Sequence, residues 1–214
     1  MPEGPEIHRA ANKIRKALEG MVIEDVEITV PRFSEAGQDF IGNAVNRVEA
    51  RGKAMLIHFD NFVMYSHNQL YGRWTVNLKE TAAKKWNRSL RISLTTEKHT
   101  CRLWSATDIL LMEPWELSGH SYLSKLGPDV VIPETTVEEL VEHMNQKKFQ
   151  RRRLKVLLLD QGFFAGIGNY LRSEVLFTSG LHPDRTVSSL SDEEKKRLAE
   201  QALFLSRQSY DVPG

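Results

Sequence analysis

The sequence is poor in cysteine, with one residue, Cys101, among 214. A single thiol excludes an internal disulfide framework and any zinc site built on several thiolates, and the seven histidines show no metal-ligand spacing. We therefore expect no metal and no other cofactor. Cys101 is interpreted as a small buried hydrophobic residue rather than a nucleophile.

Long apolar runs are also missing. No stretch approaches the ~20 residues that cross a bilayer, and the start of the chain lacks a signal-peptide core. The expectation is a soluble intracellular protein without a membrane partner. Neither sign of charge is in excess, since 29 Lys and Arg against 28 Asp and Glu give a net charge of +1. A nucleic-acid partner can therefore be inferred only from local clusters of charge.

The chain divides into two parts with different sequence patterns, the first typical mainly of strands and the second of helices. Apolar residues recur at three- and four-residue steps over residues 5–19 and predict a helix that Gly20 ends. From about residue 21 to 112, short segments rich in β-branched and aromatic residues predict a sandwich or flattened barrel. The expected strands are 21–30, 45–50, 53–59, 62–67, 73–78, 90–95 and 100–106.

Residues 126–135, LGPDVVIPET, contain two prolines and a glycine and predict a linker. The helical segments expected after it are 136–149, 151–160, 169–180 and 191–209, two of them with capping-box spacing. The fold class is therefore α+β. An N-terminal helix and a β-sandwich domain, residues 1–125, precede the linker and an α-helical domain, residues 136–214.

Six of the nine residues of KKFQRRRLK, residues 147–155, are basic, and two of them are Arg151 and Arg152. On composition alone, a solvated helix face and a phosphate-binding surface have about equal weight. The segment GFFAGIGNYL then places glycines, Gly168 the last, directly before a helix expected to begin near Asn169. Glycine-rich backbone that leads into a helix presents free N–H groups that suit an anion. The combination favours phosphate binding.

HNQLYG, residues 67–72, lies between two expected strands. For an isolated stretch, burial of Leu70 and Tyr71 in the core is favoured over their exposure on a DNA-binding surface. In that alternative, Gln69, Leu70 and Tyr71 form an exposed hairpin tip that wedges into a base stack. Lys53 follows a glycine at the start of a strand, and the residues alone give it no role beyond that of a solvated lysine.

The chain begins MPEGPEI. Removal of Met1 would leave Pro2 with a free secondary amine. An α-amino group titrates near ~8, so its neutral fraction can attack an aldehyde-like carbon and form a Schiff base. Glu3 and Glu6 supply one acid to protonate a leaving or ring oxygen and a second to fix the geometry. From these residues alone, a merely capped helix keeps most of the weight.

MPEGPEI, RGKA, YSHNQLYG, the LGPDV linker and LLLDQGFFAGIGNYLRSEVLF together resemble the formamidopyrimidine-DNA glycosylase and endonuclease VIII family along nearly the whole chain. The PEGPEI start and the NQLYG tip resemble endonuclease VIII more than the branch directed at 8-oxoguanine. The resemblance implies a bacterial, cytoplasmic, nucleoid-associated monomer that acts on damaged double-stranded DNA. Its activity would be that of a bifunctional glycosylase and abasic-site lyase that removes oxidised pyrimidines in base excision repair.

The resemblance also implies roles for individual residues. Pro2 would attack C1′ of the damaged nucleotide, Glu3 would protonate the ring oxygen, and Glu6 would support the site. Lys53 would lie near the DNA backbone. The helical domain would be a helix–two-turns–helix element. The implied DNA-binding residues are Gln69, Leu70 and Tyr71 in the gap left by the flipped nucleotide, and Gly168, Asn169, Arg151 and Arg152 on phosphates.

Members of the family continue into a C-terminal zinc finger whose arginine helps to grip the DNA. With one cysteine, this chain is not expected to contain that finger. A second interpretation is therefore a non-catalytic protein that binds damaged DNA or abasic sites, inactive through truncation or a retained methionine. A third is a general nucleic-acid module, RNA included. The enzyme is preferred because binding alone does not require a proline at position 2.

Overall fold

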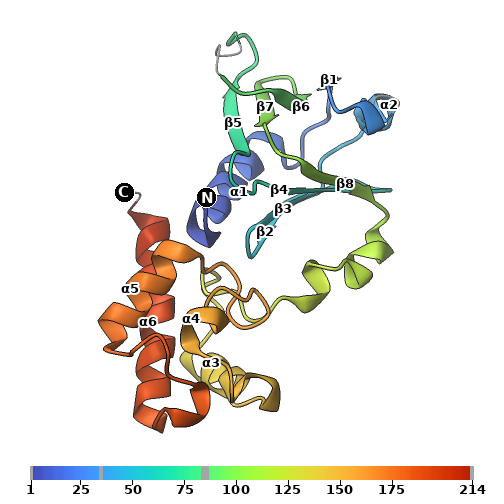
Figure 1. The fold of residues 1–214 in the computed structure, drawn as a ribbon. Coiled ribbons are helices and arrows are strands. Elements are labelled where there is room, and N and C mark those ends of the chain that lie inside the picture. The colour runs from blue at the N-terminus through green and yellow to red at the C-terminus, as the bar shows by residue number, and fades with distance from the viewer. Residues whose placement is uncertain (1, 34–35, 83–86, 213–214) are drawn as a thin grey trace. The chain divides into compact units, whose positions relative to one another are not determined.

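The computed structural model describes residues 2–33, 36–82 and 87–212, and Figure 1 follows them from the N-terminus in blue to the C-terminus in red. These residues form two compact units. The first contains Arg9–Ala50 and Ala54–Leu117. The second contains Pro2–His8, Arg51–Lys53 and the chain from Ser118 onward. The start of the chain and a three-residue turn therefore belong to the same unit as the C-terminal helices.

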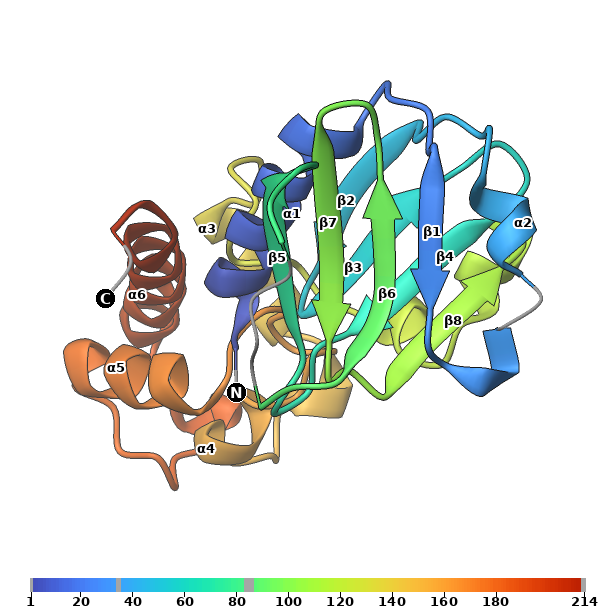
Figure 2. The ribbon, with the colours of Figure 1, turned by 90° about the horizontal axis from the view of Figure 1, so that it is seen from above.

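The first unit is built on two four-stranded sheets, which Figure 2 shows as two layers. The strand pairs β1–β6, β6–β7, β5–β7, β3–β4 and β4–β8 are antiparallel. One sheet has the order β1 (Asp25–Ile28), β6 (Leu90–Thr95), β7 (His99–Trp104), β5 (Arg73–Leu78). The other has the order β2 (Arg47–Arg51), β3 (Ala54–His58), β4 (Val63–His67), β8 (Asp108–Met112). The predicted mixture of helix and sandwich-like sheets is confirmed.

Strand β8 is the one that the sequence interpretation missed. Its residues, DILLM, form an almost continuous apolar run that does not alternate clearly, so the period-two signal of a half-buried strand is weak. Pairing with β4 determines its conformation instead, with Ile109 opposite Ser66 and Leu111 opposite Met64. The α-helices of this unit are most of α1 (Gly4–Leu18) and the short α2 (Gly37–Phe40).

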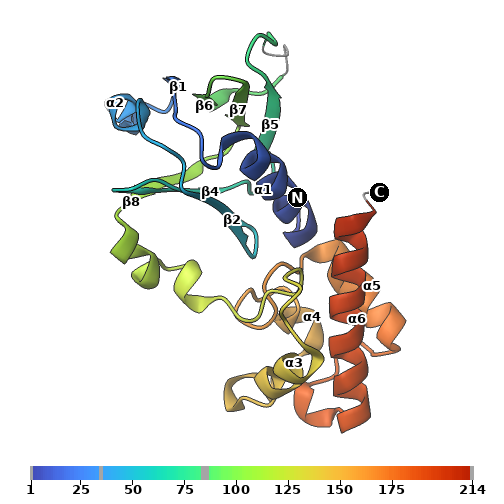
Figure 3. The same cartoon turned by 180° about the vertical axis from the view of Figure 1, so that it is seen from behind.

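The described C-terminal part of the second unit contains four α-helices, and Figure 3 shows α5 beside α6. They are α3 (Val137–Met144), α4 (Leu154–Leu157), α5 (Asn169–Ser179) and α6 (Asp192–Asp211). The predicted capping residues begin two of them. Thr136 accepts a hydrogen bond from the N–H of Glu139, and Ser191 and Glu194 form a complete capping box. Among the residues described, no helix is long and apolar enough to span a membrane.

Buried aromatic side chains form the centre of this unit's core. The rings of Phe149 and Phe163 have centroids 5.0 Å apart, and those of Phe163 and Phe164 are 4.2 Å apart. The short 3-10 helices among the described residues are η1 (Pro31–Phe33), η2 (Pro114–Gly119), η3 (Leu123–Lys125), η4 (Lys147–Phe149) and η5 (Val187–Ser189).

The basic segment 147–155 contains less helix than expected, since the sequence predicts helices over 136–149 and 151–160. A 3-10 turn ends at Phe149, and α4 begins only at Leu154. The N–H groups of Leu154 and Lys155 donate to the carbonyl oxygens of Arg185 and Pro183, at 2.9 and 3.0 Å. Because these donors bond to a distant segment, no preceding helical turn satisfies them. Long-range pairing therefore overrides local helix propensity here.

Candidate active site

Glu3 is the third residue of the sequence, yet it is buried, with only 2% of it exposed. Its carboxylate accepts three backbone hydrogen bonds from the beginning of α5. The donors are the N–H groups of Gly168 (2.7 Å), Tyr170 (2.9 Å) and Leu171 (3.3 Å). A carboxylate at a helix N-terminus satisfies unpaired donors and interacts favourably with the helix dipole. The helix end that the sequence assigned to an anion therefore holds an anion from the same chain.

The glycines around this helix end permit a close approach of two backbones. A Cβ at Gly168 would lie 2.3 Å from Cδ of Glu3. The N–H of Gly4 donates to the carbonyl of Gly166 at 2.8 Å, and a Cβ at Gly4 would lie 2.7 Å from the Gly166 Cα. Gly166 itself has a φ of 99°, in the region that favours glycine. These residues thus allow the N-terminal segment to pack directly on the glycine-rich loop.

Glu6 fixes the backbone next to Pro2, and Pro2 itself is half-buried. The Oε2 atom of Glu6 accepts a hydrogen bond from the N–H of Glu3 at 2.8 Å. Its Oε1 accepts from the hydroxyl of Tyr170 at 3.3 Å, and that hydroxyl also lies 2.8 Å from Oγ of Ser209. Burial, and beyond it the negative charges of Glu6 and Glu3, raise the pKa of Tyr170 to about 12. These contacts are consistent with the predicted supporting role of Glu6, because they restrain the backbone of Glu3.

Tyr170 is a residue that the sequence interpretation missed. It contributes both a backbone donor to Glu3 and a side-chain donor to Glu6. Its place as the second residue of α5 was the available signal, because the first N–H groups of a helix have no partner within the helix.

Lys53 is buried, with 5% of it exposed, so its interpretation as a solvated surface lysine is wrong. Burial lowers the pKa of its ammonium below the ordinary value, and the negative charge of Glu3 acts in the opposite direction. Gly52, directly before it, has a φ of 60°. The structure therefore brings Pro2, Glu3, Glu6 and Lys53 together in the second unit. Met1, whose removal the chemistry of Pro2 requires, lies outside the described residues.

The predicted tip belongs to the first unit, and its apolar side chains do not enter the core. Leu70 is 57% exposed and Tyr71 67% exposed, which excludes the core alternative. Gln69 has a φ of 50°, and its Oε1 accepts a hydrogen bond from Thr107 Oγ1 at 2.5 Å. The guanidinium of Arg88 donates to the carbonyl of Tyr71. Two contacts thus hold the backbone turn while its apolar side chains face solvent.

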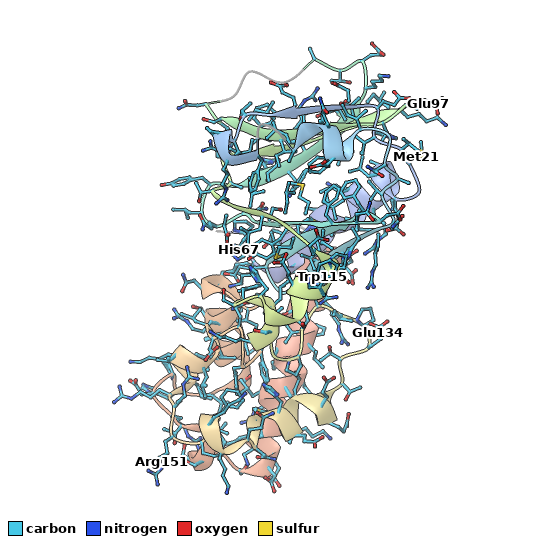
Figure 4. The ribbon with its side chains drawn as sticks, turned by 90° about the vertical axis from the view of Figure 1, so that its right-hand side faces the viewer. Met21, His67, Glu97, Trp115, Glu134 and Arg151 are labelled. Carbon is cyan, nitrogen blue, oxygen red and sulfur yellow. The ribbon has the colours of Figure 1, made fainter. Side chains whose placement is uncertain are left out.

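The basic segment of the second unit contains both free and paired cations. Arg151 is exposed and has no carboxylate partner among the described residues, and Figure 4 shows it pointing away from the ribbon. Arg152 lies 2.7 Å from a carboxylate oxygen of Asp160. Burial alone would raise the pKa of Asp160, but hydrogen bonds from Arg152 and a backbone N–H, with nearby positive charge, hold it below its ordinary value. Arg153 is 3.3 Å from Asp184.

Asn169 is the first residue of α5 and is exposed. Its side chain makes no hydrogen bond within the part of the chain that the structure describes, so the carboxamide is available to a ligand. Gly168, in contrast, is buried and its N–H donates to Glu3.

The described residues do not fit a zinc finger. Within ranges 2–33, 36–82 and 87–212, no group of three or more His, Cys, Asp or Glu side chains is placed to hold a metal ion. Cys101 is buried in β7, and burial raises its pKa to about 12. At neutral pH it is therefore a thiol and not the thiolate that zinc requires.

Two family models match the sequence. The formamidopyrimidine-DNA glycosylase N-terminal domain matches residues 1–107, and the formamidopyrimidine-DNA glycosylase H2TH domain matches residues 126–209. Endonuclease 8 of Pectobacterium carotovorum is 41% identical over 216 residues, which cover 100% of this chain and 81% of that protein. An endonuclease 8 of Escherichia coli is 41% identical over 215 residues, with the same two coverages.

Solved structures with the same fold come from Lactococcus lactis. The wild-type Fpg (MutM) complex with DNA containing N7-benzyl-Fapy-dG superposes with a TM-score of 0.83 at 20% identity, covering 100% of this chain and 80% of that one. A complex of the Fpg with abasic-site DNA gives a TM-score of 0.82 at 19% identity, covering 99% and 79%. At this level of identity the likeness shows the fold.

Proposed function

Since the chain belongs to the formamidopyrimidine-DNA glycosylase and endonuclease VIII family of DNA-repair enzymes, we propose that it is a bifunctional DNA glycosylase and abasic-site lyase. Its substrate is an oxidised pyrimidine in double-stranded DNA, and it works as a monomer. The observation that carries the proposal is the burial of Glu3 and Lys53 in the same compact unit as Pro2. Burial lowers the pKa of Lys53, and a buried ionisable group with a shifted pKa is typical of catalytic sites.

The first step is an attack by the amine of Pro2. Its nitrogen forms a bond to C1′, and the bond between C1′ and the base breaks, so that the base leaves. The new ammonium then gives its proton to the carboxylate of Glu3, which passes it to O4′ as the sugar ring opens, and an iminium joins Pro2 to C1′, while the released base takes a proton from water. Loss of a C2′ proton expels the 3′ phosphate, and a second elimination expels the 5′ phosphate. The strand is therefore cut on both sides of the lost sugar.

The contacts of Glu3 and Glu6 suit these roles. Three N–H donors hold the carboxylate of Glu3 in one orientation, so proton transfer needs no search among rotamers. Glu6 restrains the amide of Glu3 and with it the neighbouring proline. Lys53 lies near the DNA backbone in this proposal and acts as a catalytic residue, because its ammonium stabilises negative charge that develops at the reacting sugar.

The exposed tip suits the extraction of a nucleotide from the duplex. Flipping a base costs a few kcal/mol, less where the pair is already damaged. Leu70 and Tyr71 present apolar surface that occupies the vacated stack, which lowers the free energy of the flipped state. Asn169 and Arg151 bind phosphates without reading sequence, as repair at arbitrary sites requires.

Borohydride trapping tests the proposal directly. The protein, with removal of Met1 checked by intact mass, is mixed with a duplex that contains one oxidised pyrimidine and with one that contains an abasic site. Reduction of the imine is expected to give a covalent protein–DNA band. The band on the oxidised-pyrimidine duplex should be absent for Pro2→Gly, whose primary amine can still react with the aldehyde of an abasic site but lacks the secondary amine and its ring.

An undamaged duplex of the same sequence is the second control. If neither damaged duplex is trapped although the methionine is absent, the enzymatic proposal fails. Tight binding to the abasic duplex under those conditions would instead support a non-catalytic protein that recognises damage.

A further inference from the structure

Two consecutive backbone N–H groups hold the turn that carries Lys53. The N–H of Gly52 donates to Oδ2 of Asp129 at 2.8 Å, and the N–H of Lys53 donates to the hydroxyl oxygen of Tyr122 at 2.9 Å. Gly52 has a φ of 60°, and a Cβ there would lie 2.9 Å from the same hydroxyl oxygen. The turn is therefore fixed by side chains from the segment that follows the β-sheets, and only glycine fits its first position.

Asp129 is itself held from two directions. Its Oδ2 also accepts from Nε2 of His8 at 2.9 Å, and its Oδ1 accepts from the N–H of Val131 at 3.0 Å. Asp129 is 8% exposed, and the side chain of His8 is 15% exposed. His8 lies on α1 five residues after Glu3, so the aspartate connects the helix that begins beside the proposed acid with the turn that carries the lysine.

The hydroxyl of Tyr122 is suited to this contact. Burial raises its pKa to about 12, so at physiological pH the phenol stays neutral and keeps both its proton and its lone pairs. A neutral phenol oxygen accepts a backbone N–H without placing a negative charge near Asp129.

We propose that Tyr122 and the His8–Asp129 pair are positioning residues that hold the Gly52–Lys53 turn in the geometry that catalysis requires. The inference rests on the proposed function, since it assigns Lys53 to the reaction. A lysine side chain has four rotatable bonds, and its ammonium is placed correctly only where the backbone beneath it is fixed. A misplacement of about 1 Å in a catalytic group costs up to about a hundredfold in rate.

Amide hydrogen exchange tests the geometry without reference to activity. In the wild-type protein, the Gly52 and Lys53 amides are expected to be protected. Tyr122→Phe removes only the hydroxyl, so it should increase exchange at Lys53 and leave Gly52 protected. Unchanged exchange at Lys53 in this variant would show that the phenol does not hold the turn, and it would overturn the inference.

Single-turnover trapping at saturating abasic-site DNA tests the consequence for chemistry. Tyr122→Phe and His8→Ala are each expected to lower the rate constant about twofold to tenfold, the effect of one net hydrogen bond, with little change in the DNA concentration at half-saturation. His8→Gln, whose amide can donate from a similar position, should recover part of the loss. Tyr210→Phe is the matched control, a half-buried tyrosine of α6 that packs against the core of the same unit.

The outcomes separate this inference from the proposed function. If the wild-type protein forms no covalent complex, the proposed function fails. If the wild type reacts and both Tyr122→Phe and His8→Ala react at its rate, with melting temperatures equal to that of Tyr210→Phe, the positioning role is excluded. A loss that appears only as weaker DNA binding would also overturn it.

Discussion

The contact between Glu3 and the start of α5 predicts that Glu3→Gln destabilises the second unit although the two side chains have nearly the same shape. Oε2 accepts two N–H donors and Oε1 accepts one. A carboxamide replaces one of these oxygens with an NH2 group, which cannot accept. In the better orientation the NH2 group faces the N–H of Tyr170, and this partly buried donor loses its partner.

The magnitude follows from three losses. A hydrogen bond to a charged group contributes about 1.5–3 kcal/mol. An unsatisfied buried donor costs about 1–3 kcal/mol, and the interaction of the charge with the helix dipole adds about 0.3–1 kcal/mol. These terms overlap, so the expected decrease in the free energy of unfolding is about 2–4 kcal/mol.

Urea denaturation followed by the helical circular dichroism signal measures this decrease. For an m value of about 2 kcal/mol/M, the midpoint should fall by about 1–2 M without a change in m. Amide exchange should increase at Tyr170 before other residues of α5. Gly168→Ala should act similarly, because its Cβ would lie 2.3 Å from Cδ of Glu3 and displace the carboxylate.

The control is Glu142→Gln, an exposed glutamate of α3 in the same unit, which should change stability by less than about 0.5 kcal/mol. A midpoint for Glu3→Gln equal to that of this control would refute the reasoning, because the carboxylate would then not anchor the helix.

Three further predictions concern other parts of the chain. Leu70→Ala should change the free energy of unfolding by less than about 0.5 kcal/mol relative to the wild type. It should weaken binding to a lesion-containing duplex, measured by fluorescence anisotropy, by about five- to tenfold, because the lost contact resembles base stacking. Arg151→Ala should flatten the slope of log K against log salt by about 0.9, whereas Arg152→Ala should mainly lower the melting temperature because Asp160 loses its partner. Lys53→Met should abolish trapping and raise stability at neutral pH, and this gain should shrink as the pH rises toward 10.5.

The sign of the Lys53 effect follows from proton binding. The pKa of Lys53 in the folded protein lies below the ordinary lysine value of 10.5, so between the two values the unfolded chain binds more protons than the folded one. Stability therefore increases with pH in that interval, and below the folded pKa the cost of burying the ammonium is complete. A stability gain for Lys53→Met that does not depend on pH would contradict this account. Unchanged binding for Leu70→Ala, or an unchanged salt slope for Arg151→Ala, would exclude a DNA contact at that residue.

The sequence was sufficient to predict features that depend on neighbouring residues. The helix caps at Thr136 and Ser191, the start of α5 and most strands follow from local patterns. The burial of Lys53 and the partner of the α5 N-terminus do not, because they depend on contacts between distant segments. Glu3 and Gly168 are 165 positions apart, and no local pattern encodes that pairing. Family motifs predicted candidate site residues, and only the structure showed what each of them contacts.

The occupation of the α5 N-terminus changes how this chain can bind phosphate. A helix N-terminus carries roughly half a positive charge, and the Glu3 carboxylate already lies against it with three of the first N–H groups as donors. A phosphate that approaches α5 therefore meets a helix end whose partial charge is offset. The attraction of a phosphate to this surface therefore depends on side chains. These are the exposed amide of Asn169 and cations such as Arg151, which have no carboxylate partner in the described structure. A neutral amide adds nothing to the counterion-release slope, so the salt dependence of DNA binding reports the unpaired cations and not the helix that the glycine-rich motif precedes.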